Sequence, residues 1–282
     1  MKKNEEYIVE IIDNGFQGEG ICKIDGITIF VPNCLKGEKV KIKILKVTSK
    51  IAYGKIIELL EKSEFRTESD CQTYSRCGGC MLRHIEYAHT LEMKKQSVEN
   101  TLRKALGKEV KISEILKMEN PYNYRNKLQY PVGLDINGNP VMGVFAERTH
   151  TIIPTTNCKI QDILSQNIAN DIFDFIIKNN IKVYDEKNLA GSIRHIVIRI
   201  GKKTNEVMIT IVSNTEKIEK EIELVEYITS KYKEIKTETR PGSYLSAAHF
   251  PPSLTNHARG HCIYAKADGI TSRTGQRAVG QA

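Results

Sequence analysis

The sequence lacks two features that would place a protein in or across a membrane. It contains no run of about 18 apolar residues, the length that a membrane-spanning helix needs. Its start, Met-Lys-Lys-Asn-Glu-Glu, lacks the apolar core of a signal peptide. We therefore expect a cytoplasmic protein with no membrane partner, and no protein partner is indicated.

Acidic residues are too few to balance the basic ones. The chain has 42 Lys and Arg against 34 Asp and Glu, a net charge of +8 and a pI of about 9.0. A basic balance favours a polyanionic partner, because neutralising phosphates releases counterions. The alternative is a basic surface with no partner.

The first 62 residues are predicted to form a small OB-like β-barrel. Asp25-Gly26 marks a hairpin turn, and Lys39–Val47 alternates between lysines and apolar residues. Short strands with glycine-rich turns are typical of a five-stranded oligonucleotide-binding barrel. The alternation leaves a row of lysines on one face, so Lys41 and Lys43 are candidate RNA contacts. The alternative is that the lysines protect an edge strand.

Residues 63–237 are predicted to form an α+β domain. Apolar residues at helical spacing from Ile85 to Leu106 predict an amphipathic helix that ends at Gly107. Asn137-Gly138 lies between two apolar runs and predicts a hairpin. Further predictions are helices over 164–178 and 218–232 and strands over 193–200 and 206–212.

Three of the seven cysteines are crowded into one segment. Cys71, Cys77 and Cys80 have the spacing C-x5-C-x2-C, and Cys158 follows far downstream. Metal binding is the usual explanation for such crowding in a cytoplasmic chain, where disulfides are rare. The two glycines after Cys77 leave room for backbone amides to approach the sulfurs of a cluster.

Two metals can take four thiolates. A 4Fe–4S cluster is held by four cysteines, and zinc also forms such sites. Zinc ribbons usually have two C-x2-C knuckles, and Cys158 has no such partner, so the pattern favours the iron–sulfur cluster. Cys22 and Cys34 lie in apolar strand contexts and are interpreted as core residues. Cys262 has no recognisable partner.

The composition changes near residue 238. Up to Thr237 the chain is rich in Lys, Ile and Glu, whereas Glu238 to Ala282 carries Pro, Ser, Ala, His, Arg and Gly with one lysine, Lys266. No periodic apolar pattern predicts a packed core there. We expect residues 238–282 to be a disordered tail, of a composition that suggests a frameshift or a joined sequence.

Several motifs occur in order along the chain. After the barrel come Cys71-x5-Cys77-Gly-Gly-Cys80, Tyr124-Arg125-Asn126-Lys127, Cys158 and Arg194-His195-Ile196-Val197-Ile198-Arg199. Together they resemble the iron–sulfur RNA uracil-5-methyltransferases that modify 23S ribosomal RNA and begin with a TRAM domain. The resemblance covers roughly residues 5–237.

The resemblance implies that Cys71, Cys77, Cys80 and Cys158 ligate a structural 4Fe–4S cluster. It also implies that the TRAM barrel and the central domain bind RNA, and we expect Arg125 and Lys127 to contact phosphates. Ion pairs on a strand surface are the alternative for these two residues.

The resembled enzymes carry a further, Rossmann-like domain with an S-adenosylmethionine turn and a cysteine nucleophile. The nucleophile is needed because C5 of uracil attacks a methyl group only after a thiolate adds at C6. Residues 238–282 contain none of these parts, and Arg83 and Thr90 replace two glutamines of the family. We therefore expect a truncated or frameshifted member that binds RNA and a cluster without catalysing. S-adenosylmethionine would serve only the intact enzyme.

Two other functions share part of this pattern. A free-standing RNA-binding iron–sulfur module with no enzymatic role is the main alternative. A radical S-adenosylmethionine methylthiotransferase also combines a TRAM domain with a cluster. Its C-x3-C-x2-C motif and its C-terminal TRAM domain disagree with this sequence.

Overall fold

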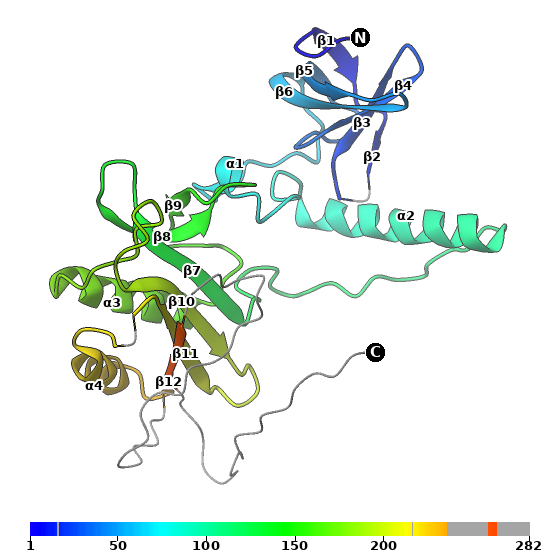
Figure 1. Ribbon diagram of the computed structural model, residues 1–282. Coiled ribbons are helices and arrows are strands. Elements are labelled where there is room, and N and C mark those ends of the chain that lie inside the picture. The colour runs from blue at the N-terminus through cyan, green and yellow to red at the C-terminus, as the bar shows by residue number, and fades with distance from the viewer. Residues whose placement is uncertain (16, 216, 236–258, 264–282) are drawn as a thin grey trace, which may run out of the picture. The chain divides into compact units, whose positions relative to one another are not determined.

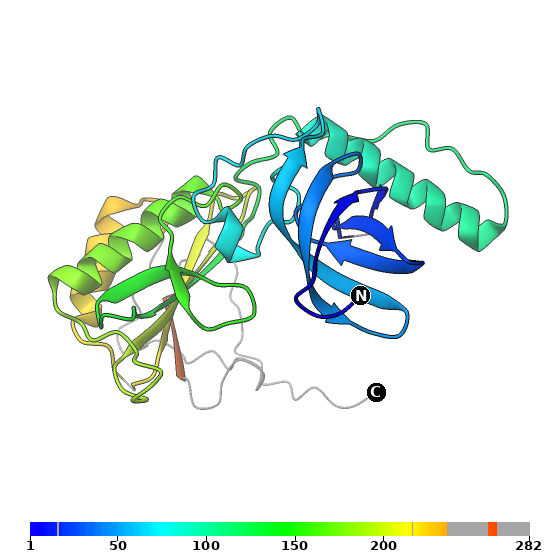
Figure 2. The same ribbon diagram turned by 90° about the horizontal axis from the view of Figure 1, so that it is seen from above.

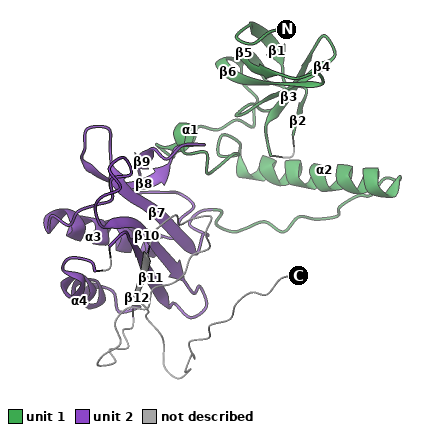
Figure 3. Ribbon diagram, in the orientation of Figure 1, with its two compact units in different colours: residues 1–121 green, residues 122–282 purple. Residues whose placement is uncertain are grey.

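The computed structural model describes residues 1–15, 17–215, 217–235 and 259–263 (Figure 1). It divides into two compact units, Met1–Pro121 and Tyr122–Ala282 (Figure 3). The sequence placed a domain boundary at residues 62 and 63, whereas this division lies at residues 121 and 122. Both units combine β-sheets with few helices, in agreement with the predicted α+β class.

Unit 1 opens with one six-stranded sheet that curls around a core (Figure 2). The strand β1 contacts β3, although the two are not neighbours in the sheet, as expected for a small barrel. The extra strand relative to the five predicted is β2, whose two residues pair with β3. In the order β1-β5-β6-β4-β3-β2, the strands are β1 (Glu6–Glu10), β5 (Lys39–Val47), β6 (Ile51–Glu61), β4 (Ile27–Val31), β3 (Gly20–Ile24) and β2 (Asp13–Asn14).

Two predictions for this sheet are confirmed by the geometry. Asp25 and Gly26 have φ angles of 51° and 80°, and positive φ at both positions is what a two-residue hairpin turn between β3 and β4 needs. The inward positions of β5 are fully buried, in agreement with the alternating pattern. The outward positions of this strand are its lysines, together with the exposed Leu45 where the register shifts.

Cys22 and Cys34 lie in the core of this sheet, as interpreted from the sequence. Both side chains are buried. Burial raises the pKa of Cys22 to about 11 and that of Cys34 to about 12. Both thiols are therefore protonated at neutral pH and behave as small core residues.

The rest of unit 1 carries two helices, α1 (Tyr74–Cys77) and α2 (Tyr87–Leu106). The helix α2 confirms the prediction from Ile85 to Leu106 to within two residues. It ends at Gly107, which has a φ of 65° and donates its backbone N–H to Arg103 O. Glycine reaches this left-handed conformation without strain and so terminates the helix.

Unit 2 is a second six-stranded sheet with two helices (Figure 1). The helix α3 (Ile163–Lys178) packs on β7 and β10, and α4 (Glu221–Lys231) packs on α3. Isoleucines from these elements dominate its core. In the order β12-β11-β10-β7-β8-β9, the strands are β12 (Arg259–Ile263), β11 (Val207–Ser213), β10 (Ile193–Ile200), β7 (Lys127–Leu134), β8 (Pro140–Phe145) and β9 (Ile152–Pro154).

The predicted elements of unit 2 are found close to their expected positions. The hairpin at Asn137-Gly138 joins β7 and β8, and the helix expected over 164–178 is α3. The tail predicted over 238–282 lies outside the described residues, apart from the backbone of β12. Among the helices that are described, none is both long and apolar enough to cross a membrane.

Candidate functional site

Three of the four predicted metal ligands lie on one loop of unit 1, between β6 and α2. Cys71, Cys77 and Cys80 are all half-buried. Cys71 Sγ lies 3.4 Å from Thr73 Oγ1, and Cys77 ends the short helix α1. The loop therefore presents its thiols at the surface of the unit rather than in its core.

The backbone after Cys77 approaches the thiol closely. A Cβ added at Gly79 would lie 3.2 Å from Cys77 Sγ, closer than nearly all such contacts in proteins. Gly78 has a φ of 63°, a conformation that favours glycine. Hydrogen bonds to the sulfurs are one of the means by which proteins tune iron–sulfur clusters. The geometry thus favours glycine at position 78, and a side chain at position 79 would crowd the Cys77 thiol.

A buried ion pair fastens this loop to the N-terminal sheet. The Glu38 carboxylate is fully buried and accepts hydrogen bonds from Arg66 Nη2 at 2.7 Å and from Leu35 N at 2.8 Å. Arg66 Nε also donates to Glu38, and its Nη2 donates to Asn33 O at 2.7 Å. Burial acts to raise the pKa of Glu38, but the bonds from Arg66 outweigh it and hold that pKa below its usual value.

A second contact holds the middle of the loop. The Tyr74 hydroxyl, between Cys71 and Cys77 in the sequence, lies 2.7 Å from His84 Nδ1. Burial, reinforced by the Arg66 charge, lowers the pKa of His84 to about 4, so its imidazole is neutral at pH 7. The Tyr74 hydroxyl also donates to Asn33 Oδ1 at 3.3 Å. This bond and the Glu38–Arg66 pair join the cysteine loop to the sheet and explain why the division into units falls after this loop rather than before it.

Cys158 lies in unit 2, between β9 and α3, and is half-buried. Its backbone N–H donates to Gln166 Oε1. Gln166 is itself buried and donates through Nε2 to Gln161 O at 3.1 Å. A neutral amide on α3 therefore fixes the segment that carries this cysteine.

Within the part of the chain that the structure describes, no group of three or more His, Cys, Asp or Glu side chains is close enough together to hold a metal ion. Three predicted ligands belong to unit 1 and one to unit 2. None of the six cysteines whose side chains are described forms a disulfide. The four-cysteine cluster therefore stays a prediction.

The predicted RNA contacts of unit 2 lie at the start of β7. Arg125 is exposed, and its backbone N–H donates to Ile160 O at 2.9 Å. Lys127 faces Arg199 across the β7–β10 pair, so two cations stand side by side. Arg199 is exposed, and the motif that contains it indicated no role for it. Its position between Ile198 and Ile200, both buried, was the signal that could have placed it on the outer face.

The predicted lysine row lies on the outer face of β5, where each lysine faces a residue of β6. From one end to the other, the pairs are Lys39–Glu61, Lys41–Glu58, Lys43–Lys55 and Lys46–Tyr53. Lys41 Nζ also lies 2.9 Å from Glu6 Oε2 of β1. The row is therefore neutralised at one end and cationic at the other. Sequence reasoning missed Tyr53 and Lys55, although they alternate with buried residues in β6.

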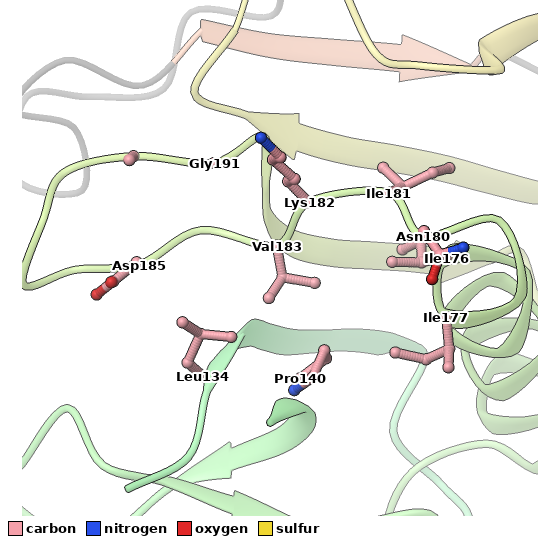
Figure 4. Close-up of a pocket in the computed structure, with 11 residues that line it drawn as sticks. Leu134, Pro140, Ile176, Ile177, Asn180, Ile181, Lys182, Val183, Asp185 and Gly191 are labelled. Carbon is pink, nitrogen blue, oxygen red and sulfur yellow. The ribbon is translucent and has the colours of Figure 1, made fainter. Parts of the chain in front are cut away.

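Unit 2 also has an open pocket of about 520 Å³. Leu134 and Val183 point toward one another across it, and Ile177 lines its far side (Figure 4). Aliphatic side chains dominate the lining, and Asp185 is its one acidic residue. We assign no chemistry to this pocket.

The chain is similar to known proteins over most of its length. Residues 2–57 match the TRAM domain family, so the curled sheet of unit 1 is a TRAM domain. An uncharacterized RNA methyltransferase of Clostridium acetobutylicum is 44% identical over 240 residues, which are 84% of this chain and 52% of that protein. One of Staphylococcus epidermidis is 40% identical over 215 residues, covering 76% of this chain and 47% of that protein.

The chain is thus strongly homologous to proteins named as RNA methyltransferases. It spans about half the length of the curated relatives it matches. Among solved structures, the Pyrococcus abyssi tRNA (uracil-54, C5)-methyltransferase in complex with S-adenosyl-L-homocysteine matches with a TM-score of 0.56. The match has 23% identity and covers 77% of this chain and 48% of that one, so it shows a shared fold.

Proposed function

We propose that this chain binds RNA and a 4Fe–4S cluster as the recognition part of a cytoplasmic RNA uracil-5-methyltransferase. The observation that carries the proposal is strong similarity to RNA methyltransferases over 84% of the chain, including a TRAM domain. The fold shared with a tRNA (uracil-54, C5)-methyltransferase supports uracil C5 as the methylated atom. We assign 23S ribosomal RNA as the target because of the cysteine motif described above.

The proposal assigns Cys71, Cys77, Cys80 and Cys158 as ligands of the cluster. The Gly79 backbone beside Cys77 Sγ and the half-buried state of all four cysteines support it. The cluster, when bound, would stabilise the fold and would not take part in redox chemistry. The chain's own part is to hold the loop, which it does through Glu38 and Arg66.

Lys41, Lys43, Arg125 and Lys127 are proposed to contact RNA phosphates. Arg125 is exposed and Lys127 faces a second cation, which favours an anion between them. Lys41 is paired with Glu6, but both side chains are more than a third exposed. Exposed ion pairs contribute at most about 1 kcal/mol, so Lys41 can exchange Glu6 for a phosphate.

The division of roles along the chain is part of the proposal. Residues 1–62 would bind RNA as the TRAM domain, and residues 63–237 would carry the cluster and further RNA contacts. Binding of S-adenosylmethionine and methyl transfer are proposed for the whole protein of the relatives' length. The 282-residue chain alone is proposed to bind without transferring a methyl group, since residues 238–282 show no nucleophile loop.

The test measures binding and methyl transfer on the same material. Anaerobically purified chain is titrated against labelled fragments of 23S ribosomal RNA and against transfer RNA, and then incubated with radiolabelled S-adenosylmethionine. We expect salt-dependent binding with preference for the ribosomal fragments and no transfer. A preference for transfer RNA would overturn the ribosomal assignment, and methyl transfer would overturn the division of roles. Absence of RNA binding at low salt would overturn the whole proposal.

A further inference from the structure

The outer face of the TRAM sheet carries an aromatic and cationic patch beside the β5–β6 turn. We propose that this patch, which we call the platform and which consists of Phe30, Lys46, Tyr53 and Lys55, is a stacking site for single-stranded RNA. The inference rests on the proposed function for RNA as the partner, and it places the strongest contact of the domain away from Lys41.

Strand register puts the four side chains on one face. Lys46 pairs with Tyr53 across β5 and β6, and Tyr53 pairs with Phe30 across β6 and β4. Directly opposed residues of neighbouring strands project to the same side of a sheet. The neighbours Ala52 and Gly54 are buried, so Tyr53 and Lys55 point outward.

The aromatic pair offers the ring of Tyr53 to solvent, and Phe30 beside it is half-buried. The ring centroids of Phe30 and Tyr53 are 6.0 Å apart and the rings are tilted by 31°. Tyr53 remains 43% exposed although aromatic side chains are usually buried. Proteins that bind single strands use such rings, because every base has a face that can stack on them.

The lysines around the rings are not neutralised as those at the far end are. No salt bridge within 4 Å is found for Lys46 or Lys55 among the described residues, whereas Lys39 is paired with Glu61 at 3.2 Å. Lys55 faces Lys43 directly, and like charges at opposed positions destabilise a sheet, although Lys43 also faces Glu6 of β1 on its other side. A bound phosphate chain would neutralise Lys55 and so reduce its repulsion with Lys43.

The chemistry of the platform selects single-stranded RNA as its occupant. The exposed ring of Tyr53 and the half-buried ring of Phe30 need unstacked bases, and a duplex hides the faces of its bases in its own stack. The surrounding lysines match the charge of a phosphate backbone. A protein partner at this face is the competing occupant, and the experiment below separates the two.

The experiment titrates the full chain with a fluorescein-labelled oligouridine of about 10 nucleotides, within the site size of an OB-like fold. The variants are Tyr53→Ala, Tyr53→Phe and the double variant Lys46→Gln/Lys55→Gln. The matched control is Lys39→Gln, which changes the same residue type on the strand of Lys46 but at the neutralised end. Each variant is also melted by circular dichroism to confirm folding.

We expect Tyr53→Ala to weaken binding by about 5- to 150-fold, which corresponds to one lost stacking contact, while Tyr53→Phe retains it. The double lysine variant should flatten the slope of log K against log salt by about 1.4, since each phosphate contact to a single strand contributes about 0.7. Lys39→Gln should leave the slope unchanged. Photo-crosslinking of a 4-thiouridine oligomer should label peptides from β4 or β6.

Failure of the platform and failure of the proposed function give different results in this experiment. If the unmodified chain binds no RNA, the proposed function fails and the platform fails with it. If the chain binds RNA but the Tyr53 and lysine variants keep its affinity and salt slope, the platform is wrong and the proposed function stands. Crosslinks confined to other strands would likewise refute the platform, even where Tyr53→Ala does not fold. If a protein partner uses this face instead, the variants should likewise keep the affinity for RNA and the salt slope of the unmodified chain.

Discussion

The two units hold their predicted metal ligands with different chemistry. Unit 1 fastens the loop of three cysteines with an ionised carboxylate, Glu38, and a guanidinium, Arg66. Unit 2 fastens Cys158 with the neutral amide of Gln166. The helix α1 buries no residue, so its loop has little apolar packing and depends on these charges. The residue that fastens the loop in unit 1, Glu38, therefore titrates, whereas Gln166 in unit 2 does not. We call these two residues the anchors of the predicted ligands.

The largest expected effect breaks the charged anchor. Glu38→Gln leaves the Arg66 cation buried against a neutral partner, and removing one member of such a pair costs about 3–5 kcal/mol. Urea denaturation should show this loss of the free energy of unfolding, together with a lower iron content after reconstitution. The control is Glu58→Gln on the exposed face of β6, which should lose at most about 1 kcal/mol because its pairing with Lys41 is exposed. Equal midpoints for both variants would refute a structural role of the buried pair.

Acid should remove the same anchor without a mutation. The pKa of Glu38 is lower in the folded chain than its usual 4.5, so its stabilisation is present above about pH 4.5 and is lost as pH falls through the lowered value. The difference in unfolding free energy between the unmodified chain and Glu38→Gln should therefore shrink below pH 4.5. Measuring both proteins side by side cancels the titration of other groups. A difference that stays constant from pH 7 to pH 3 would mean that the carboxylate is not ionised in the fold.

The neutral anchor of unit 2 should matter less. Gln166→Leu leaves the Cys158 N–H without its acceptor, and an unpaired, partly buried group costs about 1–3 kcal/mol. This loss should not change between pH 7 and pH 4, in contrast to that of Glu38→Gln. Gln96→Leu, on an exposed position of α2, is the control for the change of side chain. A pH-dependent loss at Gln166 would erase the difference between the two anchors.

The smallest expected effect has the opposite sign. Lys55→Glu replaces the like-charged pair with Lys43 by an opposite-charged one, which should stabilise the sheet by about 0.2–1 kcal/mol. The same change should weaken binding of oligouridine. Thermal melting of this variant should therefore show a higher melting temperature, and an RNA titration should show weaker binding. A variant that is less stable and binds normally would contradict both halves.

Local patterns in the sequence predicted local structure well. The helix α2 and its end at Gly107, the hairpin at Asp25-Gly26 and the buried face of β5 depend on residues close together in the chain. The cysteine motif likewise identified a loop. Its glycine at position 79 leaves room beside the Cys77 thiol that a Cβ would crowd.

Contacts between distant residues could not be read in the same way. Glu38 and Arg66 are 28 positions apart, and nothing near either one marks them as a buried pair. The lysine row looked uniform because its partners on β6 are set by three irregularities of register between the strands. Each bulge shifts which residue faces which lysine, so the neutral and cationic ends emerged only with the sheet.

The central claim is that four cysteines from both units ligate one iron–sulfur cluster, and metal analysis tests it most directly. The chain is reconstituted anaerobically with iron and sulfide, and bound iron, sulfide and zinc are counted beside Cys158→Ser and Cys22→Ser. We predict about four irons and four sulfides per chain, retained in Cys22→Ser and lost or reduced in Cys158→Ser. One tightly bound zinc, or iron content that is indifferent to Cys158, would contradict the account.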